Sequence, residues 1–112
     1  MRVRPRADTN QSEIVEALRE HGVHVVITTA LGSGFPDLVC GYRGLTVLME
    51  VKMPQSVVTA GGRGGKRLRL ADEYDPQFGF SPDEIAFHAK WPGQPIVTVR
   101  RIGDALRAVG VW

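Results

Sequence analysis

The sequence has one cysteine, few aromatic residues and no long apolar stretch. Cys40 is the single cysteine among 112 residues, which excludes an internal disulfide and a cysteine-based zinc site. Its place in an apolar run predicts a buried side chain. No apolar run approaches the roughly 20 residues that a membrane-spanning helix needs. The basic start of the chain is not followed by an apolar segment, so we expect no secretory signal. These absences favour a reducing cytoplasm.

The chain also lacks a strong excess of either charge. Fourteen Lys and Arg residues against twelve Asp and Glu residues give a formal net charge of +2, and 43% of the residues are hydrophobic. This composition excludes a wholly disordered chain and predicts one domain over residues 1–112. The basic residues are nevertheless clustered, at residues 2–6, at residues 100–107 and in a glycine-rich stretch that holds Arg63, Lys66, Arg67 and Arg69. Such clusters can bind phosphate backbones, although each alone fits a solvated segment equally well.

Apolar periodicity and turn residues predict an α/β protein with the order α-β-β-β-α-β-α. The first helix is predicted to begin at Asn10, with Glu13 completing a capping box, and the second at the Ser81–Glu84 box. The last helix is predicted over residues 103–110. Aliphatic and β-branched runs predict four strands, at residues 23–28, 37–42, 45–52 and 95–101. Between about residues 53 and 79 the pattern gives way to Gly, Pro and basic residues, which predicts a flexible basic insertion.

Three charged residues, Asp37, Glu50 and Lys52, interrupt the aliphatic strands. If the second and third strands form a hairpin that turns on residues 43–44, Asp37 lies opposite Glu50, with Cβ atoms about 5 Å apart. Lys52 then projects from the same face as Glu50, because side chains two residues apart share a face. A longer turn over residues 41–44 would shift this register and separate the two carboxylates.

Two opposed carboxylates repel each other unless a cation lies between them. Mg²⁺ takes hard oxygen ligands, often one or two carboxylates with water and phosphate oxygens. Such an ion lowers the pKa of a bound water and polarises a phosphodiester, and an adjacent ammonium offsets negative charge on the phosphorus. A turn aspartate alone, or a Glu/Lys pair alone, is ordinary surface chemistry. Their combination on one hairpin predicts metal-assisted phosphodiester hydrolysis.

With these residues the stretch GFPDLVCGYRGLTVLMEVK resembles the PD-(D/E)xK nuclease signature, specifically the virus-type replication-repair nuclease (VRR-NUC) domain. SPDEIAFHAKWPGQPIVTVRRIGDAL is similar to the closing helix, strand and helix of that family. The resemblance implies a restriction-endonuclease-like fold, a mixed β-sheet flanked by helices, and Mg²⁺- or Mn²⁺-dependent DNA cleavage. It implies Asp37 and Glu50 as metal ligands, the backbone carbonyl of Val51 as a further ligand, and Lys52 as the catalytic lysine.

Three further residues are candidates for the site. Such folds often add a glutamate from the first helix, for which Glu13 is the best match, although a capping role fits it equally. Independently of the resemblance, the loop that leads into Asp37 would lie beside the metal, so Ser33 could contact a phosphate. Glu84 stands where the family commonly has glutamine, and an extra carboxylate there would either recruit metal or repel DNA.

The remaining candidates are expected to be structural. His21, His24 and His88 lack metal-ligand spacing, and we expect His88 to be a packed or capping residue. Phe87 and Trp91 are expected to seal the core.

The favoured interpretation is a DNA endonuclease. One small domain provides one active site, so cutting a duplex or a four-way junction would call for a homodimer. The likeness to junction-cleaving phage or prophage enzymes suggests branched DNA as a substrate, in the cytoplasm of a bacterium or a phage-infected host cell. Two alternatives are a non-catalytic DNA-binding module that keeps the nuclease fold, and a nucleotide-binding protein. The second is disfavoured because Ala60 and Arg67 break the P-loop pattern of AGGRGGKR.

Overall fold

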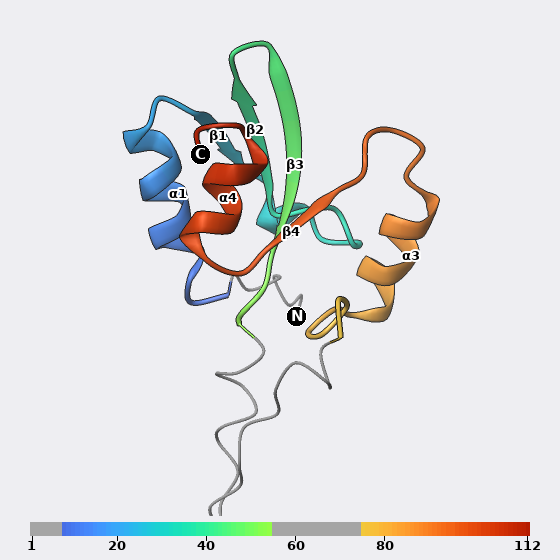
Figure 1. Ribbon diagram of the computed structural model, residues 1–112. Coiled ribbons are helices and arrows are strands. Elements are labelled where there is room, and N and C mark those ends of the chain that lie inside the picture. Colours follow the sequence, from blue (N-terminus) through green and yellow to red (C-terminus); the bar gives the residue numbers. More distant parts are fainter. Residues whose placement is uncertain (1–7, 55–74) are drawn as a thin grey trace, which may run out of the picture.

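Four strands form one mixed sheet with helices on both sides (Figure 1). The computed structural model describes residues 8–54 and 75–112. For these residues the predicted order of helices and strands is confirmed, with a short 3₁₀ turn added before the second strand. In chain order the elements are α1 (Gln11–Glu20), β1 (His24–Ile27), η1 (Thr29–Leu31), β2 (Leu38–Tyr42), β3 (Leu45–Val51), α3 (Pro82–Lys90), β4 (Val97–Val99) and α4 (Ile102–Ala108). Among the described residues, no helix has the length and apolar character to cross a membrane.

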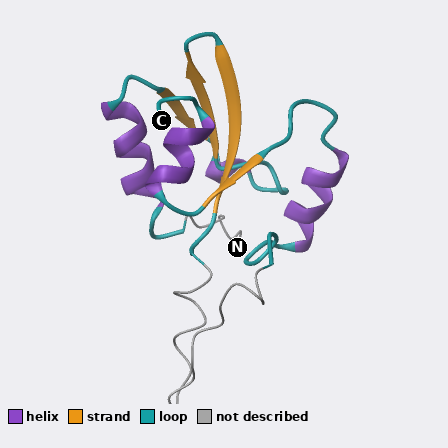
Figure 2. Cartoon of the chain, viewed as in Figure 1, coloured by secondary structure: helices purple, strands orange, loops and turns teal. Residues whose placement is uncertain are grey.

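The hairpin of β2 and β3 has the predicted register. Strands β1, β2 and β3 are antiparallel in that order, and β4 joins the other edge of β3 in parallel (Figure 2). The chain turns on Arg43 and Gly44, whose φ angles of 49° and 83° are those of a two-residue type I′ turn. Tyr42 therefore pairs with Leu45 and Leu38 with Met49. The same register places residue 37, just before β2, opposite residue 50.

The core lies between the sheet and the pair of helices α1 and α4 (Figure 1). Alternate strand residues face this layer, and Cys40, Met49 and Val99 are fully buried in it. The helices contribute the side chains Ile14, Val15, Leu18, Ala105 and Leu106. Burial of Cys40 as a small apolar side chain is confirmed.

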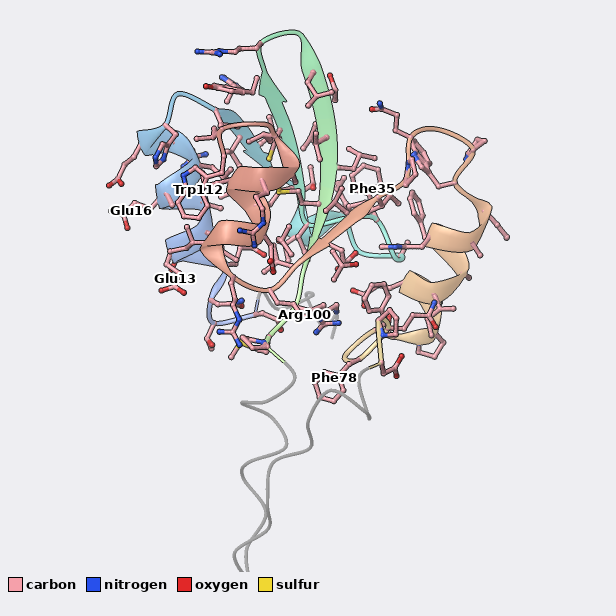
Figure 3. All side chains as sticks on the ribbon, viewed as in Figure 1. Glu13, Glu16, Phe35, Phe78, Arg100 and Trp112 are labelled. Carbon is pink, nitrogen blue, oxygen red and sulfur yellow. The ribbon has the colours of Figure 1, made fainter. Side chains whose placement is uncertain are left out.

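Helix α3 lies on the opposite side of the sheet and is attached differently (Figure 1). It has no fully buried residue. Phe87 packs edge-on against Phe35 and stacks on Trp91, each with ring centroids 5.5 Å apart, and Figure 3 shows Phe35 between the sheet and this helix. Gly34 lies so close to α3 that a Cβ there would meet the Asp83 carbonyl. The expectation that Phe87 and Trp91 seal the core is wrong: neither belongs to the core cluster, which lies on the α1 and α4 side of the sheet, and Trp91 is 38% exposed.

Buried Arg100 connects the two chain segments that flank residues 55–74. Its Nη1 donates to the Met53 carbonyl at 2.9 Å, and its Nη2 donates to the carbonyls of Pro76 and Phe78 at 3.1 and 3.0 Å. Figure 3 shows Arg100 beside Phe78 at this end of the sheet. Arg100 is therefore a structural residue, whereas the sequence left its cluster open to either phosphate binding or a solvated segment. The predicted DNA-binding residues Arg63, Lys66, Arg67 and Arg69, with most of the predicted insertion, lie outside the described residues.

Asn10 is the predicted N-cap of α1, but its side chain does not cap the helix. Its Nδ2 donates instead to the carbonyls of Lys52 and Arg100, at 3.1 and 2.9 Å. The predicted capping box with Glu13 is therefore wrong, because the Asn10 side-chain amide donates instead to the carbonyls of Lys52 and Arg100 at the ends of two strands. These bonds join the start of α1 to the ends of β3 and β4.

We expect Arg100→Met to lower the free energy of unfolding by about 3 kcal/mol, because three hydrogen bonds are lost and each contributes about 1 kcal/mol. Urea denaturation followed by circular dichroism measures this loss. The matched control is Arg101→Met at the exposed neighbouring position, where we expect a change within about 0.5 kcal/mol. Equal losses in the two variants would contradict the structural role of Arg100.

Candidate metal centre and catalytic site

Glu50 is a buried carboxylate on β3. Its neighbours Met49 and Val51 are buried in the core on the α1 and α4 side, so strand alternation directs Glu50 to the side that faces α3. The residue is 0% exposed, and its Oε2 has no hydrogen-bond partner among the described residues. A buried carboxylate oxygen without a partner is costly, and a bound cation would remove that cost.

Asp37 is fixed against the end of β3 by backbone contacts. Its Oδ2 accepts a hydrogen bond from the Val51 amide at 2.9 Å. Its own amide donates to the Met49 carbonyl at 3.0 Å, and its carbonyl accepts from Thr28 at 2.7 Å. The carboxylate is therefore held beside Glu50 by contacts on both neighbouring strand segments.

The electrostatics of Glu50 reflect this crowding. Burial, together with the adjacent Asp37 side chain and the charge of Glu84, raises the pKa of Glu50 to about 10, and the opposing charge of Lys52 does not offset this. Without a cation, the carboxyl is protonated at neutral pH. The donor set fits a hard divalent ion, for which two carboxylates are typical ligands. Among residues 8–54 and 75–112 no three His, Cys, Asp or Glu side chains group to hold a metal, so backbone oxygens and water would complete its coordination.

Lys52 projects beside Glu50, as predicted. Its Nζ lies 3.8 Å from Glu50 Oε2 and 2.7 Å from Glu84 Oε1, and its side chain is 12% exposed. Its backbone amide donates to the Val99 carbonyl at 3.0 Å. Burial alone would lower the pKa of Lys52, but the ion pair with Glu84 outweighs it and raises the pKa. The Lys52 amine therefore stays protonated beside the two acidic side chains.

Glu84 has two roles. Its carboxylate closes the predicted capping box with Ser81, which is confirmed, and it also binds Lys52. Burial would raise the pKa of Glu84, but the hydrogen bonds from Lys52 and from the Ser81 amide outweigh burial and lower it. The sequence predicted either a metal-recruiting or a DNA-repelling carboxylate, and the structure places it as the counterion of Lys52.

Two site residues were missed. His88 Nε2 lies 3.3 Å from Glu50 Oε1, and its ring packs edge-on against Phe80 with centroids 4.9 Å apart. The expectation of a packed residue was thus incomplete. A signal was present, since positions 84 and 88 are one helical turn apart and share a face. Asp8 precedes α1, and its charge interacts with Lys52 and Asp37; burial raises its pKa. Nothing in its sequence context indicated this.

Other candidates lie apart from the two carboxylates. Glu13 is exposed on α1 and points away from the sheet (Figure 3). It borders a pocket with Asn10, Met53 and Arg100, and it does not complete a metal-binding group with the candidate ligands in the described part of the chain. Ser33 is exposed in the loop before Asp37, with a positive φ of 57°. A phosphate contact for Ser33 stays a prediction.

Comparisons with known protein families, curated proteins and solved structures give no match to this chain. Its function is therefore inferred from the residues of the hairpin and from their geometry.

We expect the metal-free protein to lose stability as pH rises. The pKa of Glu50 is about 10 in the folded state, against an ordinary value of 4.5, so the folded protein binds a proton that the unfolded chain has released. The contribution of this group is full below its ordinary pKa and is lost as pH rises through the folded value, by up to about 1.4 kcal/mol per pH unit. Urea denaturation of wild type and of Glu50→Gln, in EDTA at about pH 6 and about pH 8, isolates the contribution of Glu50 to the free energy of unfolding. A stability difference between the two proteins that is independent of pH would contradict the protonation of Glu50.

Proposed function

We propose that this chain is a metal-dependent endonuclease that hydrolyses DNA phosphodiester bonds. One observation carries the proposal: the buried Glu50 carboxyl group, one oxygen of which has no hydrogen-bond partner among the described residues, lies beside Asp37 and 3.8 Å from the Lys52 ammonium. This arrangement does not stabilise the fold, because burying two acidic side chains together costs free energy. Perturbed ionisable residues of this kind are typical of functional sites.

The fold supports the same proposal. Three antiparallel strands, a fourth strand parallel to β3 and helices on both sides are compatible with the restriction-endonuclease-like fold implied by the likeness to VRR-NUC nucleases. The pairing of β2 with β3 brings the PD and ExK segments together.

Each residue has a role that follows from its place. Mg²⁺ or Mn²⁺ held by Asp37 and Glu50 would lower the pKa of a bound water and polarise the phosphodiester. The Val51 amide orients Asp37, and the Val51 carbonyl is the proposed backbone ligand. Lys52, whose Nζ lies 3.8 Å from Glu50, would offset negative charge that develops on the phosphate. Glu84 holds that ammonium in place from α3.

The substrate and the assembly belong to the proposal. A single domain with one such site would cut both strands of a duplex, or two strands of a four-way junction, as a symmetric homodimer. Size-exclusion chromatography with light scattering measures the assembly. Cleavage of a four-way junction beside a linear duplex of the same sequence measures the preference for branched DNA.

The test is nicking of a supercoiled plasmid by the full chain in Mg²⁺, in Mn²⁺ and in EDTA. We expect cleavage with either ion and none in EDTA, loss of cleavage in Asp37→Asn, and unchanged cleavage in Asp83→Asn, an exposed aspartate on α3. DNA binding without cleavage in any ion would favour the non-catalytic binding module. Cleavage that survives Asp37→Asn would reject the site.

A further inference from the structure

One face of helix α3 contacts both Glu50 of β3 and Lys52, which directly follows the strand. Glu84 binds Lys52 at 2.7 Å, and His88, one helical turn later, lies 3.3 Å from Glu50. His88 is held in turn by its edge-on contact with Phe80. Its side chain is only 16% exposed, so water does not compete strongly for the ring.

The two oxygens of Glu50 are therefore distinct. Oε1 is engaged by His88 Nε2, whereas Oε2 is buried, has no hydrogen-bond partner in the described part of the chain, and lies 3.8 Å from Lys52 Nζ. A contact to one oxygen fixes the rotation of the carboxylate and leaves the other free for a ligand. Without it, the carboxylate would have to be ordered each time an ion binds.

We propose that His88 is a positioning residue that holds Glu50 in the orientation that binds the divalent cation. The inference rests on the function proposed above. In metal sites, the groups that hydrogen-bond a ligating side chain fix its orientation and tune its affinity, and their loss weakens metal binding. In this proposal His88 acts on the metal through Glu50, because its Nε2 contacts Glu50 Oε1.

A packing role and a positioning role predict different results for two substitutions. His88→Phe keeps an aromatic ring against Phe80 but removes the nitrogen that contacts Glu50. His88→Gln removes the ring but can place its amide nitrogen near the position of Nε2. If His88 only packs, phenylalanine is the better replacement; if it positions Glu50, glutamine is.

The experiment is titration of the metal-free full chain with Mn²⁺, followed by isothermal calorimetry, in wild type, His88→Phe, His88→Gln, Glu50→Gln and His24→Phe. His24→Phe is the matched control, because His24 is exposed on β1. We expect His88→Phe to weaken Mn²⁺ binding by about 10- to 100-fold. We expect His88→Gln to restore most of the affinity and His24→Phe to leave it unchanged. Circular dichroism establishes that each variant is folded.

The outcomes separate this inference from the proposed function. If wild type binds Mn²⁺, Glu50→Gln does not, and His88→Phe binds as tightly as wild type, the positioning role is overturned while the metal centre stands. Weaker binding in both His88 variants, with phenylalanine the milder, also overturns it in favour of packing. If wild type itself does not bind Mn²⁺, the proposed function fails and the inference with it.

Discussion

Glutamine in place of Glu50 is expected to abolish metal-dependent DNA cleavage while leaving the metal-free protein at least as stable as wild type at neutral pH. Loss of a metal ligand removes several kcal/mol of transition-state stabilisation, which corresponds to a fall in rate of about 10³-fold or more. The stability does not fall, because a neutral amide replaces a carboxyl whose burial already raises its pKa to about 10. Plasmid nicking and thermal unfolding in EDTA measure the two effects.

The control for Glu50→Gln is Glu16→Gln at an exposed position of α1, where neither activity nor stability should change (Figure 3). Retained cleavage in Glu50→Gln would remove the residue from the metal centre. A strongly destabilised variant would show that the carboxyl makes contacts that an amide cannot replace, and would contradict the account of its burial.

Methionine in place of Lys52 is expected to lower the cleavage rate by about 10²- to 10³-fold, the usual cost of removing one group that stabilises transition-state charge. Mn²⁺ binding should persist, because Lys52 is a cation and does not ligate the ion. Single-turnover cleavage and calorimetry on the same preparation distinguish the two properties. Methionine keeps the apolar stem of the side chain beside Phe80, whose ring centroid lies 5.5 Å from the ammonium.

Lys90→Met is the matched control for Lys52→Met, because Lys90 is an exposed lysine at the end of α3. Its substitution should leave cleavage within about twofold of wild type, as expected for an exposed residue without such contacts. If both variants lose activity to the same degree, the effect is one of net charge on DNA binding, and the catalytic role of Lys52 is rejected.

The hairpin and its charged residues could be predicted from sequence because their determinants are local. A two-residue turn on Arg43 and Gly44 fixes the register, and alternation along β3 then fixes the face on which residues 50 and 52 lie. The Ser81–Glu84 capping box was predictable for the same reason, since its partners are three residues apart.

The remaining contacts of the site join residues far apart in the chain. His88 lies 38 positions from Glu50, and Asn10 lies 42 positions from Lys52, the residue whose carbonyl it binds. Sequence patterns near Asn10 predicted a helix cap. In the folded protein its side chain instead donates to carbonyls at the ends of two strands. In the same way Glu13 matched a family position, but the orientation of α1 leaves its side chain exposed.

The turn on Arg43 and Gly44 lies at the far end of the hairpin from Glu50 (Figure 1), yet the face of the sheet on which Glu50 lies depends on the number of residues between them. Adding or deleting one residue of β3 between the turn and Glu50 would exchange the two faces beyond that point, so that Glu50 would face the aliphatic layer and Met49 would face α3. Length changes should therefore be tolerated only at the tip of the hairpin. An odd-numbered change within its strands would disrupt both the candidate site and the packing of the core.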